Sequence, residues 1–167
     1  MKNSNVEIIT HKNSIPLLKT EKPLNKMKPL NFCTKTAFTL YALFSNYKER
    51  KVPVVYMRLK DYIVSDDDEK MMKSIGVDGQ ILHTPGHTDD SITLLMNDGS
   101  AFVGDLSMNI LNLCGCDYRP IFADNMDTVF ESWKKLIKKG AKVIYPSHGD
   151  PFDVEELVAV LKEHNKI

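Results

Sequence analysis

The sequence predicts a single α/β domain in which helices flank a mixed β-sheet. The chain has 167 residues, 43% of them hydrophobic, which is enough for one core of ordinary size. Short apolar runs that end at turn residues are typical of strands, and two later segments have apolar residues at helical spacing. We therefore treat residues 1–167 as one domain. Residues 1–52 form an amino-terminal segment with weaker patterns, and residues 53–167 form the core that carries the motifs.

The amino-terminal segment gives four expectations. Val6 to Thr10 predicts a short strand, and Ser14 to Lys19 predicts one helical turn. Residues 20–30 are rich in lysine and proline, so they predict a solvent-exposed connection. Thr34 to Tyr47 predicts a helix whose apolar residues fit one face only in part.

Beyond Pro53 the chain predicts a meander of short strands. Asn97-Asp98-Gly99 has the composition of a tight turn between two of them. A further strand is expected later in the chain, between the two helical segments. The predicted strands are 54–57, 62–64, 80–83, 92–96, 101–103 and 143–145.

Two amphipathic helices follow the meander. The first is expected to begin near Asp127 and to end at Gly140, and the second to begin at Asp153. Trp133 on the first helix is predicted to lie in the core. The apolar faces consist of Val129, Phe130, Trp133, Leu136 and Ile137 on the first helix, and of Val154, Leu157, Val158 and Leu161 on the second.

Charge and composition exclude several classes of partner. The 22 basic and 22 acidic residues balance, so neither nucleic acid nor a membrane surface is an expected partner. The sequence contains no signal-peptide pattern and no apolar run that could span a bilayer, which predicts a soluble protein. Cys33, Cys114 and Cys116 lack disulfide-like spacing, so reduced thiols in a cytoplasmic protein are the simplest interpretation.

Three motifs place metal-competent side chains where a predicted strand gives way to a loop. His87 follows His83-Thr-Pro-Gly, Asp105 follows Gly104, and His148 follows Pro146-Ser. Imidazole nitrogens and carboxylate oxygens are ligands for zinc, and also for iron or manganese. Because only a sheet edge can gather residues from such distant positions, we expect His87, Asp105 and His148 to converge there.

These motifs resemble those of the metallo-β-lactamase superfamily in order and spacing. The resemblance rests on residues 81–92, 102–105 and 146–149 and extends from about Asp61 to Leu161. It implies a metallo-β-lactamase-like αββα sandwich, here partial, with a metal site at one edge. It further implies that His87 binds a first metal ion, that Asp105 bridges and is the candidate catalytic residue, and that His148 binds a second. Zinc would be the usual metal, and iron or manganese the alternatives.

The sequence departs from that family in a way that bears on activity. The His-x-His-x-Asp-His motif that supplies further ligands in relatives does not occur, and residues 1–82 contain one histidine, His11. Val6 to Leu18 resembles the stretch that follows this motif, so we expect a chain truncated at its amino terminus. Asp90 stands where many relatives have glycine. With two protein donors for each metal position, we expect weak or partial occupancy.

Two functions remain open at this stage. One is a hydrolase-like protein whose ancestral reaction is attack of metal-activated water on a small ester, thioester, lactone or phosphoester. The alternative is a catalytically inactive family member that acts as an interaction or structural module. A partial sandwich would expose an apolar sheet face, so we also expect a homo-oligomer.

Other polar residues have simpler explanations. His83 is expected to hydrogen-bond within its turn, and His11 and His164 to lie on the surface. Cys114-Gly-Cys116 could bind metal or act in redox chemistry, but loop thiols are the preferred interpretation. Asp66 to Asp68 lacks a calcium-loop pattern and predicts a solvated turn.

Overall fold

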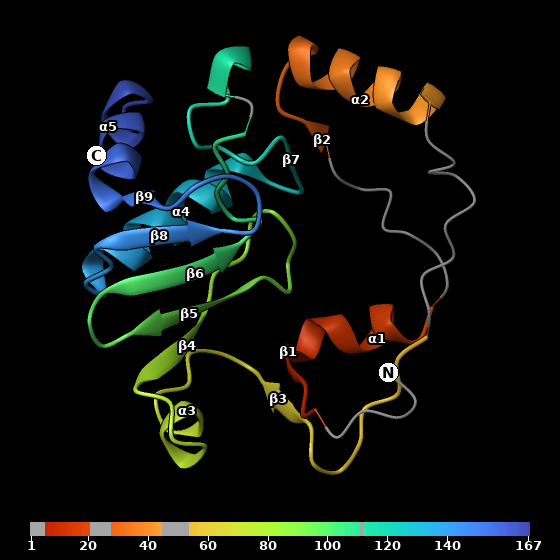
Figure 1. The fold of residues 1–167 in the computed structure, drawn as a ribbon, viewed down its shortest axis with the longest axis vertical. Helices are drawn as coiled ribbons and strands as arrows, with labels where there is room; N and C mark the ends of the chain where they lie inside the picture. Colours follow the sequence, from red (N-terminus) through yellow and green to blue (C-terminus); the bar gives the residue numbers. More distant parts are fainter. Residues whose placement is uncertain (1–5, 21–27, 45–53, 111) are drawn as a thin grey trace.

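The computed structural model describes residues 6–20, 28–44, 54–110 and 112–167. Its centre is a five-stranded mixed sheet in the order β4-β5-β6-β8-β9 (Figure 1). The β6–β8 pair is parallel, and the other three pairs are antiparallel. The predicted α/β class, a mixed sheet with flanking helices, is therefore confirmed. The strands are β4 (Gly79–His83), β5 (Ile92–Met96), β6 (Ser100–Gly104), β8 (Val143–Pro146) and β9 (Phe152–Asp153).

Two helices, α4 (Met126–Lys138) and α5 (Val154–Glu163), cover one face of this sheet (Figure 1). Alternation along the strands turns Leu95, Val103 and Ile144 toward the helices, where all three are buried. Trp133 of α4 has no exposed surface, as predicted for a core residue, and its indole N–H donates to the Leu106 carbonyl at 3.1 Å. This layer is the main hydrophobic core.

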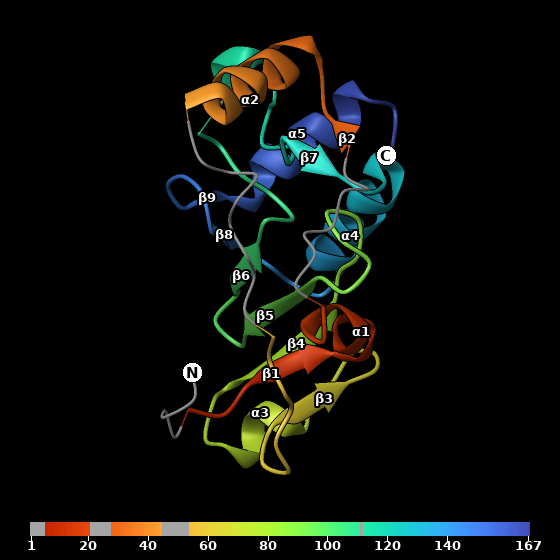
Figure 2. The same ribbon diagram turned by 90° about the vertical axis from the view of Figure 1, so that its right-hand side faces the viewer.

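A smaller unit lies against the opposite face at the β4 edge (Figure 2). Strands β1 (Ile9–His11) and β3 (Tyr62–Val64) pair in parallel, and α3 (Met71–Ser74) lies beside them. Buried Val64, Met71 and Met72 pack with Ile81 of β4. The predicted helical turn after β1 is present as η1 (Lys12–Ser14) and α1 (Ile15–Leu18).

The smaller unit covers only part of that face. Register places Ile81, Leu94, Phe102 and Tyr145 in one row across β4, β5, β6 and β8. Ile81 is 4% exposed, whereas Phe102 is 46% exposed and its ring stacks on Tyr145 with centroids 4.9 Å apart. The row is thus buried at the β4 end and open to solvent at the β6–β8 end.

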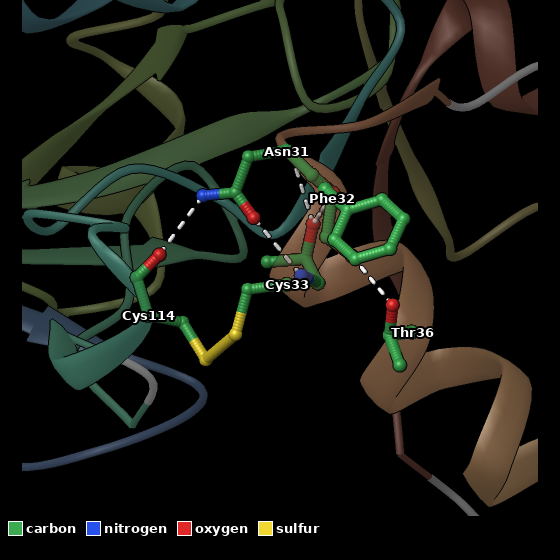
Figure 3. The surroundings of a disulfide bond; sticks show 6 residues. Asn31, Phe32, Cys33, Thr36 and Cys114 are labelled. Carbon is green, nitrogen blue, oxygen red and sulfur yellow. Dashed lines mark hydrogen bonds between the residues drawn. A yellow bond between two sulfur atoms is a disulfide. The ribbon is translucent and has the colours of Figure 1, made fainter.

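Helix α2 (Phe32–Phe44) lies at the end of the molecule away from β1 and β3 (Figures 1 and 2). The short strand β2 (Lys28–Pro29) precedes it and pairs with β7 (Phe122–Ala123). A disulfide joins Cys33 of α2 to Cys114 of η3 (Asn112–Cys114), and the Asn31 side-chain amide donates to the Cys114 carbonyl at 2.9 Å (Figure 3). The prediction of three reduced thiols is therefore wrong for this pair, because folding brings together cysteines that are far apart in the sequence.

Several local predictions also need correction. Residues 54–57 do not form a strand. The predicted helix at 34–47 begins earlier, at Phe32, and is helical up to Phe44, while residues 45–47 lie outside the described residues. Part of the connection expected at 20–30 is strand β2, while residues 21–27 are likewise outside the description. Sequence patterns did not predict β2, β7, β9 or α3. The three strands have two residues each, too few to show an alternation, and α3 is a single turn that follows Lys70, which is not a typical capping residue.

No helix in the described ranges is both long and apolar enough to cross a membrane.

Asp61 holds β1 in place, which gives a pH prediction. Its carboxylate accepts hydrogen bonds from the Ile8 N–H at 3.1 Å and from Arg58, and these bonds lower the pKa of Asp61 well below its usual range, the Arg58 side chain contributing most. A lowered carboxyl pKa stabilises the fold above the ordinary value of about 3.9, and this stability is lost as pH falls below it. We expect the protection of the β1 amides, relative to their intrinsic exchange rate at each pH, to fall below that pH, and to be lower in Asp61→Asn than in wild type at neutral pH. Equal exchange in wild type and variant at neutral pH would contradict this role.

Candidate metal site

The parallel pairing of β6 with β8 brings two of the three predicted site residues into neighbouring loops. Gly104 at the end of β6 lies opposite Pro146 of β8, after a register shift in β6. The Ser147 N–H donates to the Gly104 carbonyl at 2.9 Å, and Gly104 has a φ of +59°, in the left-handed region that glycine adopts most easily. Asp105 and His148 follow directly. The irregularity aims both side chains at the same edge.

All three predicted residues lie together at this edge. The His148 Nε2 is 3.6 Å from Oδ1 of Asp105, and the His87 Nε2 is 3.6 Å from Oδ2 of the same carboxylate. Exposure rises across the site, because the side chain of His87 is 16% exposed, that of Asp105 36% and that of His148 57%. The carboxylate therefore stands between the two imidazoles, each of which faces a different oxygen.

The loop that carries His87 is fixed by helix α4 and the residues before it. Gly86 has a φ of +136°, and a Cβ at this position would lie 2.5 Å from the Val129 amide nitrogen of α4. The Asn125 N–H donates to the Gly86 carbonyl at 3.1 Å, and the Asp124 N–H donates to the His87 carbonyl at 3.0 Å. Glycine at this position thus has two reasons, the positive φ of the bend and the close contact with α4.

Hydrogen bonding fixes the tautomer of His87. Its Nδ1 lies 2.7 Å from the Phe122 carbonyl oxygen, which can only accept, so Nδ1 carries a proton. In the neutral ring the lone pair of Nε2 then faces the lone pairs of the Asp105 carboxylate oxygen Oδ2. These lone pairs repel each other, and a cation between the nitrogen and the oxygen removes the repulsion. A backbone carbonyl on one ring nitrogen and an open second nitrogen are the arrangement that metal-binding histidines show.

Asp105 supplies a second indication of a cation. Its Oδ1 is buried and accepts no hydrogen bond from any described residue. A buried carboxylate oxygen without a partner is unfavourable unless a positive charge satisfies it. Two ligands of one zinc ion at about 2.1 Å each lie roughly 3.4–3.6 Å apart, so the 3.6 Å separations fit a cation between each histidine and Asp105.

The donor set is nevertheless incomplete. Within the described ranges, no three His, Cys, Asp or Glu side chains are arranged so that they could hold one metal ion. Each histidine shares only Asp105, so each position has two protein donors. Structural and catalytic zinc sites usually have at least three. The assignment of His87, Asp105 and His148 as metal ligands therefore stays a prediction.

The other histidines are accounted for by the fold. The His83 Nε2 lies 2.9 Å from the Asp89 carbonyl oxygen, so the predicted hydrogen bond within the turn is confirmed. His11 is not a surface residue as predicted, since it is 1% exposed and stacks on the His83 ring with centroids 4.0 Å apart. Its Nε2 contacts the Ser65 carbonyl at 3.0 Å, so pairing of β1 with β3 buries it. His164 is partly buried beside Phe130.

Two further expectations change. Cys116 is buried, which raises the pKa of its thiol, and Cys114 is bonded to Cys33, so the two cysteines do not form a metal-binding pair. The acidic run is more than a solvated turn. Asp67 accepts hydrogen bonds from the His83 N–H at 3.0 Å and from the Lys135 amine at 2.6 Å, and thereby ties the start of the His87 motif to α4.

Sequence reasoning missed the support that the amino-terminal segment gives to this loop. The Ser14 hydroxyl donates to the Asp90 carboxylate, and the Asn13 amide donates to Asp89 at 2.6 Å. Burial raises the pKa of Asp90, but hydrogen bonds from Ser14 and Thr88 outweigh it, so the net pKa lies below its usual value. The one available signal was the carboxylate at position 90, where the family resemblance leads one to expect glycine.

Comparisons with known proteins bear on the fold of the chain. No family model matches the chain. A β-lactamase-like protein 2 homolog from Drosophila melanogaster is 31% identical over 75 residues, which cover 45% of this chain and 23% of that protein. The sequence likeness is therefore confined to part of each protein.

Solved structures show the same fold over most of the chain. The metallo-β-lactamase family protein TTHA1429 from Thermus thermophilus matches with a TM-score of 0.58 and 18% identity, over 96% of this chain and 52% of that one. The superfamily protein ST1585 from Sulfolobus tokodaii matches with a TM-score of 0.53 and 16% identity, over 94% of this chain and 57% of that one. TTHA1623 in a di-iron-bound form matches with a TM-score of 0.54 and 16% identity, over 94% of this chain and 64% of that one. The chain thus spans between 52% and 64% of the length of these three structures.

The contact between Gly86 and α4 gives a stability prediction. In Gly86→Ala, the new methyl group would overlap the Val129 backbone and the positive φ would become strained. We expect a loss of roughly 1–3 kcal/mol in the free energy of unfolding, measured by urea denaturation. Gly76→Ala is the matched control, because Gly76 also has a positive φ but has no atom within 4 Å of an added Cβ. Equal losses in both variants would show that the contact with α4 is unimportant.

Proposed function

We propose that this chain, which has the metallo-β-lactamase fold over the part it covers, is a hydrolase-like protein that binds divalent metal weakly at two positions, one between His87 and Asp105 and one between His148 and Asp105. The observation that carries the proposal is the Asp105 carboxylate, which faces one imidazole with each oxygen at 3.6 Å and has a buried oxygen that no described donor satisfies. Zinc suits these donors best, with iron or manganese as alternatives. The di-iron-bound form of TTHA1623 supports the choice of a metal site.

Each side chain has a separate task in this proposal. His87 offers an Nε2 lone pair because Phe122 holds its Nδ1 proton. Asp105 supplies the negative charge between the imidazoles and is the candidate catalytic carboxylate. His148, the most exposed of the three side chains, offers the second nitrogen. A bound metal would polarise a substrate carbonyl or phosphoryl group and activate water for attack on an ester, thioester, lactone or phosphoester.

A pocket beside the His87 loop supports a small-molecule substrate. Its volume is about 310 Å³, and its lining includes Lys28 of β2 and the segment from Ala123 to Met126. Asp124 in that segment donates its N–H to the His87 carbonyl, so the pocket adjoins the backbone of the His87 loop, although His87, Asp105 and His148 do not line it. Lys28 and Asn125 offer donors to a polar group of a substrate, beside the carboxylate of Asp124.

Metal titration tests the proposal. Chelator-treated protein should bind Zn²⁺ or Co²⁺ by isothermal titration calorimetry, with an affinity below that of a three-ligand site. Asp105→Ala should lower the metal affinity by more than the roughly 10- to 100-fold that follows removal of an outer-shell partner, because both histidines lose the donor that they share. Asp66→Ala, a change of another exposed aspartate outside the site, should bind as wild type does.

Two outcomes would overturn the proposal. Protein purified without chelator could contain less than about a tenth of an equivalent of zinc, iron or manganese and also fail to bind added metal. Alternatively, Asp105→Ala could keep the wild-type affinity, which would reject the ligand assignment.

The open sheet face favours a second candidate function, an interaction module that associates with a second copy of itself. Phe102 and Tyr145 belong to a cross-strand row whose other end is buried by the chain's own β1–β3 unit. We infer that an apolar surface of a second copy covers Phe102 and Tyr145 in the same way. The net charge of zero gives two copies no overall repulsion. In this case the metal site would be an inactive remnant.

Light scattering at increasing concentration tests self-association. We expect wild type to form a dimer and Phe102→Asp to stay monomeric, because a carboxylate cannot be buried in an apolar interface without a partner. Phe44→Asp is the matched control, since Phe44 is 90% exposed at the far end of the molecule. A wild-type monomer at every concentration would reject this candidate.

A further inference from the structure

Asn109 connects the loop of Asp105 to the loop of His148. It follows Asp105 in the connection after β6, and its backbone N–H donates to the His148 carbonyl at 3.3 Å. Its side-chain amide donates to the Asp150 carbonyl at 3.0 Å and accepts from the Asp150 N–H at 3.0 Å. One residue thus makes three hydrogen bonds to the backbone on both sides of Gly149.

Gly149 allows this close approach. Its φ is +109°, and a Cβ at this position would overlap the Oδ1 of Asn109. Asn109 as a whole is partly buried, and its side chain reaches the loop of His148 at Asp150. The glycine in the Pro146-Ser-His-Gly motif therefore serves the contact with Asn109, which the motif alone does not reveal.

The backbone must determine where the His148 ring lies. Its side chain is 57% exposed, so packing restrains it little. On the amino-terminal side the loop is fixed by the hydrogen bond from Ser147 to Gly104, and on the carboxyl-terminal side by Asn109. His148 lies between these two attachments. The next attachment along the chain is the pairing of Phe152 in β9 with β8, so without the Asn109 side chain residues 149–151 lose the contact that fixes them next to His148.

We propose that Asn109 is a positioning residue that sets the approach of the His148 imidazole to Asp105. This inference rests on the proposed metal site and adds to it a residue that touches neither ion nor substrate. Its side chain presents one donor and one acceptor to one residue, Asp150, as a neighbouring strand would. Outer-shell partners of this kind typically change metal affinity 10- to 100-fold.

Zinc titration followed by NMR of the histidine ring nitrogens tests the proposal. In Asn109→Ala we expect half-saturation of the His148 signal to require roughly 10-fold more Zn²⁺, with no change for His87. Asn109→Asp should weaken the His148 response too, because a carboxylate accepts from the Asp150 N–H but cannot donate to its carbonyl. Asn112→Ala is the matched control, since Asn112 lies in the same connection and accepts from the Tyr118 N–H at 3.1 Å.

The outcomes separate positioning from general destabilisation. The assignment would be overturned if Asn109→Ala weakened the Zn²⁺ response of His87 as much as that of His148. It would also be overturned if Asn112→Ala weakened the His148 response as much as Asn109→Ala does. If wild-type histidines do not respond to Zn²⁺, the proposed metal site itself has failed. Crystal structures of metal-free wild type and Asn109→Ala then decide the inference separately. A His148–Asp105 separation unchanged from 3.6 Å in the variant would reject it, and a longer one would support it.

Discussion

The site depends on the parallel pairing of β6 with β8. Ala101, Val103 and Ile144 on these strands are buried against α4 and α5, so the main core holds the two strands in register. The register shift before Gly104 then ends both strands at the same edge. Hydrophobic packing on one face thereby brings Asp105 and His148 together, although neither side chain contributes to the core. The polar geometry is a consequence of core packing.

Electrostatics at this edge differ from those around Asp61. The Asp61 carboxylate is surrounded by donors from Arg58 and Ile8, and its pKa is lowered accordingly. Asp105 has no such donors among the described residues, and the imidazole nitrogens of His87 and His148 lie 3.6 Å from it, too far for hydrogen bonds. The Asp61 carboxylate, which holds β1 in place, is therefore satisfied by hydrogen-bond donors. The Asp105 carboxylate has no such donors in the described part of the chain, at a position where a cation would fit.

The sequence allowed strands β4, β5, β6 and β8 of the central sheet, the amphipathic helices α4 and α5, and the convergence of the three site residues to be predicted. Strand ends marked by motifs are informative, because a parallel sheet gathers them at one edge. The Cys33–Cys114 bond and the burial of His11 could not be predicted, because both depend on contacts between distant segments. Asn109 carries no signal of its own either, since its role appears only when the loop of Gly149 lies against it.

The amino-terminal segment shapes the site without supplying a ligand. His11 stacks on His83, with ring planes 7° apart, at the start of the loop that carries His87. Ser14 and Asn13 bind the carboxylates of Asp90 and Asp89 at the other end of that loop. A glycine at position 90 could not accept the hydrogen bond from Ser14. The carboxylate of Asp90 thus provides the acceptor that Ser14 of the amino-terminal segment requires. The amino-terminal segment therefore stabilises the His87 loop through contacts at both ends of the loop.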